Sequence, residues 1–198
     1  MSSIHPVQVR HGLRVAVVLL SVALVGCGST ERRGDASATF PPIKATYDLT
    51  GRLSARHGND ALSATFRWHH DRDSDELELA SPLGQTLAQL SGDLNGVTLR
   101  TADGRIESAA DWQTLTLRGL GWPLPVTGLS YWVQGVPRES APYVVEAGNA
   151  GAAAVLRQDG WTVAYNAFTS DRDGTQRPSR MTMSYADVEL RLVIDAWQ

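Results

Sequence analysis

Apolar and polar residues alternate along most of the chain from Tyr47 onward. Every second residue from Tyr47 to Ala55 is apolar or glycine, and the residues between them are polar. After a turn at residues 57–60, the same period of two continues from Leu62 to Trp68. Alternation of this kind is typical of antiparallel strands with one buried and one solvated face. We therefore predict a β-hairpin at the start of the folded part of the chain.

Shorter runs with the same pattern follow, separated by turn-forming segments such as S-P-L-G, G-D-L-N and A-D-G. These runs lie at residues 75–81, 86–91, 96–101, 105–108, 143–147, 152–157, 161–168, 179–186 and 188–196. Together with the first hairpin they make about eleven short strands. The pattern predicts a mainly β protein built as a barrel or as a strongly curved antiparallel sheet.

The stretch between residues 108 and 137 breaks the strand pattern. S-A-A-D at 108–111 fits a capping box with Ser108 as N-cap, which predicts a helix over about 109–118, before the glycines at 119 and 121. A second short helix is predicted from Pro125 to about Gln134, because proline favours the first turn and a glycine follows. We expect both helices to cover one face of the sheet with an apolar underside that includes Trp122, Leu129 and Trp132.

The N-terminal residues have the pattern of an exported bacterial lipoprotein. Arg10 and Arg14 precede an apolar run, residues 15–25, which is too short to span a bilayer comfortably. The run ends in L-V-G-C, which matches the lipobox, where the thiol of Cys27 is acylated and this cysteine becomes the first residue. An ordinary signal peptide with a chance cysteine is the alternative. Because Cys27 is the only cysteine, no disulfide can form within the chain.

These features divide the chain into three predicted parts. Residues 1–26 are a signal peptide, residues 27–45 an acylated flexible tether, and residues 46–198 a single domain. In bacterial lipoproteins, an aspartate directly after the acylated cysteine marks retention in the inner membrane. This chain has Gly28 at that position, so we expect the protein to be located in the outer membrane. Without the signal peptide the chain has 16 basic and 21 acidic side chains. This balance argues against nucleic acid as a partner, and attachment to the membrane has to come from the acyl chains.

The sequence offers few groups for catalysis or metal binding. His57, His69 and His70 are the histidines that remain after cleavage. Since neighbouring residues on a strand point to opposite faces, His69 and His70 cannot easily bind one metal ion. The favoured interpretation is that these histidines are solvated polar residues around a hairpin. There is no G-x-S-x-G, H-E-x-x-H or C-x-x-C motif and no glycine-rich phosphate loop. We predict no enzymatic activity, no cofactor and no metal.

Large apolar residues gather on one face of the predicted sheet. They include Leu53, Phe66, Trp68, Leu79, Met183 and Leu192. From the residues alone a packed core is the favoured interpretation, but a half-open barrel under two short helices can also leave a cavity for a lipid tail. Leu83, within the turn S-P-L-G, presents a similar choice, because it either folds back onto the core or is exposed.

Several motifs in a fixed order are similar to those of the outer-membrane lipoprotein LolB family. They are the lipobox cysteine, T-G-R-L at 50–53, F-R-W at 66–68, L-E-L-A-S-P-L-G at 77–84, G-W-P-L-P-V-T-G-L-S-Y-W-V-Q-G-V-P at 121–137, P-S-R-M-T-M at 178–183 and L-R-L-V-I-D-A-W at 190–197. The resemblance extends from about residue 47 to residue 197.

The resemblance implies a half-open antiparallel β-barrel whose helices cover an apolar cavity. It implies that the protein receives lipoproteins from the periplasmic carrier LolA and places them in the inner leaflet of the outer membrane. In the family, an exposed leucine in the loop after a strand assists membrane insertion, and Leu83 matches that position. The expected acyl-chain cavity and lid consist of Leu53, Phe66, Trp68, Leu79, Trp122, Leu129, Trp132, Met183 and Leu192.

The expected partners are a LolA-like carrier, the acyl chains of cargo lipoproteins and the outer membrane, and we expect the protein to be a monomer. The alternative is a lipid-anchored periplasmic scaffold or assembly protein with a packed core. Saturable binding of an acyl chain distinguishes the two.

Overall fold

A computed structural model describes residues 39–121, 123–147 and 153–198 of the chain. Cys27, Trp122 and the predicted signal peptide lie outside the described residues. The described residues all belong to one compact unit. This unit contains every strand and helix described below, so a protein that lacks residues 1–30 retains the complete core.

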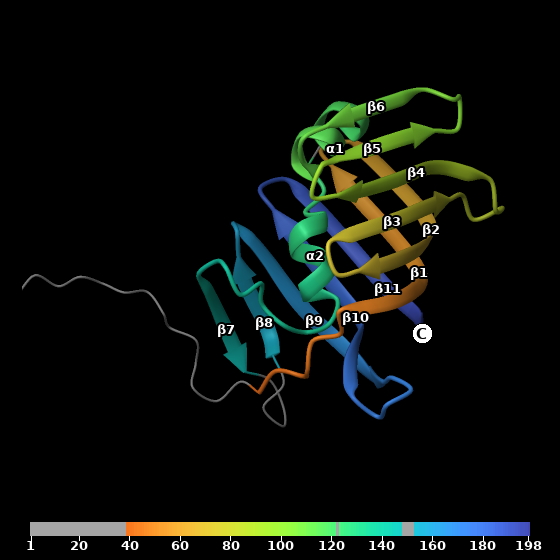
Figure 1. The fold of residues 1–198 in the computed structure, drawn as a ribbon. Coiled ribbons are helices and arrows are strands. Elements are labelled where there is room, and N and C mark those ends of the chain that lie inside the picture. Colours follow the sequence, from red (N-terminus) through yellow and green to blue (C-terminus); the bar gives the residue numbers. More distant parts are fainter. Residues whose placement is uncertain (1–38, 122, 148–152) are drawn as a thin grey trace, which may run out of the picture. The chain divides into compact units, whose positions relative to one another are not determined.

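In the described part of the chain, eleven strands form a single antiparallel sheet (Figure 1). The strands are β1 (Thr46–His57), β2 (Asp60–Asp71), β3 (Ser74–Ala80), β4 (Thr86–Asp93), β5 (Gly96–Thr101), β6 (Ile106–Ala109), β7 (Tyr143–Ala147), β8 (Ala153–Gln158), β9 (Trp161–Ser170), β10 (Gln176–Tyr185) and β11 (Val188–Trp197). Their order in the sheet is β6-β5-β4-β3-β2-β1-β11-β10-β9-β8-β7, so that β6 and β7 are its two edges. The prediction of a mainly β, half-open antiparallel architecture is confirmed.

The first hairpin shows why the alternating pattern folds as it does. β1 pairs with β2 so that Leu49 faces Trp68 and Leu53 faces Ala64, all on the buried side of the sheet. Gly51 lies opposite Phe66, at a register shift between β1 and β11. A Cβ atom at this position would come within 2.8 Å of the Phe66 ring and 2.2 Å of the carbonyl oxygen of Val193. The glycine of the T-G-R-L motif is therefore required by close packing.

Two short helices follow β6, namely α1 (Trp112–Leu120) and α2 (Val126–Trp132). The prediction that Ser108 caps the first helix is wrong, because β6 continues to Ala109, which pairs with Val97. Asp111 caps α1 instead, and its carboxylate accepts a hydrogen bond from the backbone N–H of Thr114 at 2.8 Å. The helix ends at Gly121, whose φ of 82° is the left-handed conformation that glycine adopts without strain.

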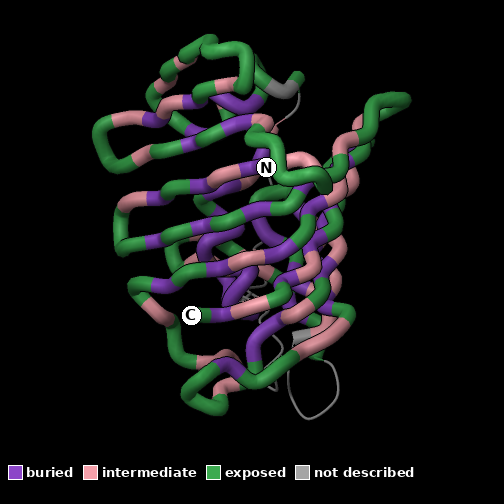
Figure 2. The backbone as a smooth tube through the Cα atoms, turned by 90° about the vertical axis from the view of Figure 1, so that its right-hand side faces the viewer, coloured by how far each residue is buried: buried purple, intermediate pink, exposed green. Residues whose placement is uncertain are grey.

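Buried residues alternate with exposed ones along the strands, and the buried side of the sheet forms one continuous core (Figure 2). α1 contacts β5 and β6, and α2 lies across the central strands (Figure 1). Leu115 from α1 and Leu129 from α2 belong to the same core as Leu49 and Met181 of the sheet. The two helices therefore complete the core, and α2 covers the middle of the buried face of the sheet.

Candidate functional site

A small apolar cavity lies between α2 and the inner face of the sheet. Its walls come from β1, β2, β3 and β11, and from the residues at the start of α2. The lining residues are Leu53, Phe66, Trp68, Leu77, Leu79, Leu124, Val126, Leu129 and Leu192. The free space inside is about 20 Å³, which is room for one or two water molecules. The cavity is thus almost filled by the side chains of its own walls.

The residues that the sequence assigned to the cavity and lid divide into three groups. Those that line the cavity together are Leu53, Phe66, Trp68, Leu79, Leu129 and Leu192. Met183 and Trp132 are buried elsewhere in the core, and Trp122 lies outside the described residues. Leu77, Leu124 and Val126 line the cavity as well, although the sequence analysis did not assign them to it.

A larger groove lies on the other side of the residues that lead into α2. It is lined by Trp112, Gln113, Pro123, Leu124, Pro125, Val126, Thr127, Gly128, Trp132, Arg138, Asp159, Trp161 and Tyr185. Its volume is about 400 Å³. Leu124 and Val126 belong to both sets of lining residues, so they form the wall between the groove and the cavity.

One side of this groove is aromatic. The ring of Trp161 stacks on that of Tyr185 at 5.3 Å between centroids, and Trp132 packs against Trp161. A Cβ atom on Gly128 would come within 2.6 Å of the Trp132 ring. The glycine in the V-T-G-L motif therefore makes room for this tryptophan within a single turn of α2.

The C-terminal end of α2 and the residues just after it are attached by hydrogen bonds to β1, to β8 and to Lys44, which precedes β1. The hydroxyl of Tyr47 donates to the carbonyl oxygen of Ser130 at 3.0 Å. The indole N–H of Trp132 donates to Oε1 of Gln158 at 2.9 Å. The Gln134 side chain accepts from the backbone N–H of Lys44 at 2.7 Å and donates to the carbonyl of Ser130. We call residues 130–134 the anchored end.

Arg177 is a buried residue that binds the anchored end through the backbone of Gln134. It is only 1% exposed and donates to the carboxylate of Asp171 at 3.2 Å, to the carbonyl oxygen of Pro42 at 2.8 Å and to that of Gln134 at 3.4 Å. Its guanidinium also lies over the ring of Trp197. Sequence reasoning missed this residue, because the two carbonyl groups that it binds are 43 and 135 positions away along the chain.

Asp171 is the acidic partner in this cluster, and it also pairs with Lys44 at 3.2 Å. Burial opposes ionisation of the carboxyl, but hydrogen bonds from Arg177 and Lys44 outweigh it and lower the pKa of Asp171 to about 2. Burial next to Asp75 raises the pKa of Tyr47 well above its ordinary value, so this hydroxyl keeps its proton for the bond to Ser130. The anchored end therefore keeps its hydrogen bonds across the neutral pH range.

The N-terminal half of α2 is attached differently. Pro125 is the N-cap, and no described side chain caps the helix there. The backbone N–H of Leu124 donates to the hydroxyl of Thr116 at 2.8 Å, and this hydroxyl donates to the carbonyl of Trp112. We call residues 124–129 the gate segment. Within the part of the chain that the structure describes, its other contacts with the sheet are made by the apolar side chains of Leu124, Val126 and Leu129.

A curved antiparallel sheet with a lid over an apolar cavity is the arrangement that the sequence motifs led us to expect. The family model of the outer membrane lipoprotein LolB matches residues 45–197, which include every strand and both helices. The chain belongs to the LolB family.

Proteins named outer-membrane lipoprotein LolB match nearly the whole chain. The one from Thiobacillus denitrificans is 37% identical over 186 residues, which cover 93% of this chain and 97% of that protein. The one from Azoarcus is 36% identical, with 93% of this chain and 92% of that protein covered. A solved outer membrane lipoprotein-sorting protein domain from Vibrio parahaemolyticus matches 85% of this chain and 88% of its own with a TM-score of 0.51. At 9% identity, that last likeness concerns the fold alone.

Two leucines of this LolB-family chain are strongly exposed, at opposite ends of β4. Leu83 is 89% exposed in the loop before β4, and Leu94 is 82% exposed in the turn after it. The eight residues of β4 separate them by about 26 Å. Leu83 therefore does not fold back onto the core, and Leu94 provides an equally exposed leucine at a distant site.

Each of the three described histidines, His57, His69 and His70, pairs with a nearby carboxylate. Nδ1 of His70 and the indole N–H of Trp68 both approach the same oxygen of Asp75, each at 2.8 Å. His69 pairs with Asp48 on the other face, and this hydrogen bond raises the pKa of His69. Within the described residues, no group of three or more potential ligands is arranged for a metal ion. Neither described helix is long and apolar enough to cross a bilayer.

Proposed function

We propose that this protein receives lipoproteins from a LolA-type periplasmic carrier and inserts them into the inner leaflet of the outer membrane. The observation that carries the proposal is the match to the LolB family over residues 45–197. The apolar cavity under α2 supports it, because nine apolar side chains meet there in the middle of the sheet. An acyl chain is the ligand that such a lining suits.

Transfer of this kind changes no covalent bond. The acyl chains pass from one apolar surface to another and then into the bilayer, and the direction is set by a more favourable free energy at each step. We therefore infer that the protein is not an enzyme. We also propose that it acts as a monomer. The cavity has to widen for this task, since about 20 Å³ is far below the roughly 300–1,000 Å³ of typical ligand sites.

Acylated Cys27 is the proposed membrane anchor. The chain after the predicted signal peptide has an excess of acidic side chains, so it gains little from anionic lipid surfaces. Each buried CH₂ group of an acyl chain contributes about 0.8 kcal/mol, and two or more chains give stable anchorage. Residues 27–45 then act as a tether that leaves the domain free to meet its carrier.

Leu83 is the proposed membrane-inserting residue. An exposed leucine on a narrow loop can enter the headgroup region without a change in the fold, because it makes few contacts in the protein. Its loop is closed by hydrogen bonds between the backbones of Ser81 and Gln85 and of Gly84 and Ser81. The side chain therefore points away from a well-formed turn.

The first test is the binding of an acyl chain. A fluorescent fatty acid titrated into the protein without residues 1–30 is expected to show saturable binding that tryptophan energy transfer reports. A linear, non-saturable response would contradict the proposal. It would favour a lipid-anchored scaffold with a packed core, for which the small volume of the cavity is the supporting observation.

The second test is delivery. In the full-length acylated protein, Leu83→Glu is expected to abolish insertion of lipoproteins supplied by a LolA-type carrier into vesicles. Leu94→Glu is the matched control, since it puts the same charge on an equally exposed leucine, and it is expected to leave delivery unchanged. Equal loss in both variants, or loss in neither, would remove Leu83 from the proposed mechanism.

A further inference from the structure

The gate segment separates two spaces that together are large enough for an acyl chain. The cavity of about 20 Å³ is lined by apolar side chains alone, and the groove of about 400 Å³ is lined by both polar and apolar residues. Leu124 and Val126 line both. If these two side chains move aside, the groove and cavity become one site whose volume lies in the range of known ligand sites.

The contacts of α2 determine which part of it can move. The anchored end has hydrogen bonds to β1, to β8 and to the residues before β1, and Arg177 adds a buried charge–dipole contact. Among the described residues, the gate segment has one hydrogen bond to another element, from the backbone of Leu124 to Thr116. Its other contacts with the sheet are apolar, and an acyl chain in the cavity would replace them with equivalent ones.

Thr116 is well suited to act as a latch on this segment. Its side chain is completely buried, and its hydroxyl both donates to the carbonyl of Trp112 and accepts from the N–H of Leu124, each at 2.8 Å. A buried backbone donor that loses its acceptor is unfavourable, whereas the same donor in an open gate would bind water. The hydroxyl of Thr116 therefore favours the closed gate specifically.

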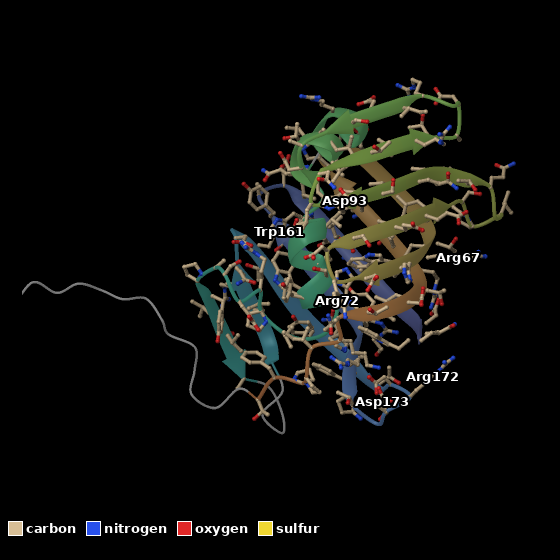
Figure 3. All side chains as sticks on the ribbon, viewed as in Figure 1. Arg67, Arg72, Asp93, Trp161, Arg172 and Asp173 are labelled. Carbon is tan, nitrogen blue, oxygen red and sulfur yellow. The ribbon has the colours of Figure 1, made fainter. Side chains whose placement is uncertain are left out.

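We propose that an acyl chain enters the cavity from the groove beneath Pro123 and Pro125, by displacement of the gate segment, and that Thr116 is the positioning residue that holds this gate closed. The anchored end stays in place and acts as the hinge. Trp161, which Figure 3 shows at the end of the β9–β10 hairpin opposite to Asp173, forms the fixed far side of the entrance. The inference rests on the proposed function, because it assumes that an acyl chain is the ligand.

Thr116→Val tests the latch, and Thr116→Ser is its matched control. Valine keeps the shape and leaves the N–H of Leu124 without an acceptor, whereas serine keeps the hydroxyl. The closed state of the valine variant becomes less favourable, so a larger fraction of molecules is open before binding. We expect the fluorescent fatty acid to bind it roughly tenfold faster and roughly tenfold more tightly than the wild type. The serine variant is expected to match the wild type.

Equal rates and affinities in the valine variant and the wild type would overturn the latch while leaving the proposed function intact. Absence of saturable binding in the wild type and both variants would overturn the proposed function, and the route into the cavity with it. These two failures are therefore distinguishable in one set of titrations on the protein that lacks residues 1–30.

Hydrogen exchange on the wild type tests the same idea without a substitution, in case the valine variant does not fold. The amide of Leu124 is expected to exchange at least tenfold faster than that of Val133, which bonds to the carbonyl of Leu129 within the helix. Added fatty acid is expected to change the exchange of Leu124 and not that of Val133. Equal protection of both amides, unaffected by fatty acid, would overturn the proposal.

Discussion

The two ends of α2 are held in place by different kinds of contact. The anchored end, residues 130–134, depends on hydrogen bonds and a buried ion pair that come from three separate elements. The gate segment, residues 124–129, depends on apolar contacts and on the hydroxyl of Thr116. Polar contacts need a fixed geometry, and apolar contacts do not. A helix fixed at one end in this way can uncover a cavity without leaving the sheet.

The largest expected effect on stability comes from substitution of Arg177, which binds the anchored end. Arg177→Met leaves the carboxylate of Asp171 buried with one cation fewer and frees the carbonyl of Gln134. Loss of one partner from a buried pair costs about 3–5 kcal/mol, and we expect this decrease in the free energy of unfolding in urea. Arg180→Met, at an exposed position on the same strand, is the control and should cost less than about 0.5 kcal/mol. Similar values for the two variants would mean that the cluster does not stabilise this end.

The pH dependence of stability tests the same cluster. The pKa of Asp171 in the folded protein is about 2, below its ordinary value of 3.8. A depressed pKa stabilises the fold above the unfolded value, and this stabilisation disappears as the pH falls from about 4 to about 2. Over that interval we expect the wild type to lose on the order of 2 kcal/mol more stability than Asp171→Asn does. A wild type and variant with parallel pH profiles would contradict the assignment.

A smaller effect is expected from Tyr47→Phe. The substitution removes the hydrogen bond to Ser130, whose carbonyl still accepts from Gln134, so the free energy of unfolding should fall by about 1 kcal/mol. Because this bond belongs to the anchored end, the rate at which fatty acid binds should stay that of the wild type. An accelerated rate, like that expected of Thr116→Val, would show that both ends of α2 move together.

The smallest effect is expected from Tyr165→Phe, which is also the control for Tyr47→Phe. The hydroxyl of Tyr165 is buried and has no hydrogen-bond partner among the described residues. Removal of an unsatisfied polar group is neutral or stabilising by up to about 1 kcal/mol. Thermal unfolding should therefore show an unchanged or higher midpoint, and a clear decrease would mean that the hydroxyl has a partner.

Much of the sheet could be predicted from the sequence, because alternation is a local property. The pairing of Leu49 with Trp68 follows from the period of two on either side of the turn at residues 57–60. The start of α1 could not be predicted in the same way. Ser108 has the right spacing for an N-cap, but it lies in β6, which pairs with β5. Strand pairing outweighs helix capping here, and it depends on tertiary structure that the local sequence does not show.

The candidate site was only partly predictable for a similar reason. Leu53, Phe66, Leu79 and Leu192 are recognisable from their place on the apolar face, and the structure places them around one cavity. The volume of that cavity depends on how the side chains of Leu124, Val126 and Leu129 fill it. The latch at Thr116 depends on a hydrogen bond to a backbone atom, and no sequence pattern distinguishes that threonine from Thr114 two positions earlier.

The central claim is that an acyl chain occupies the cavity beneath the gate segment, and photo-crosslinking tests it most directly. A fatty acid with a photoreactive group at its terminal carbon would be bound to the protein without residues 1–30, irradiated, and the attachment sites determined by mass spectrometry. We predict attachment to the cavity wall, at Leu53, Leu79 or Leu192, with loss of labelling when unlabelled fatty acid competes. Attachment only to the outer face of the sheet, or labelling that competitor does not reduce, would contradict the claim.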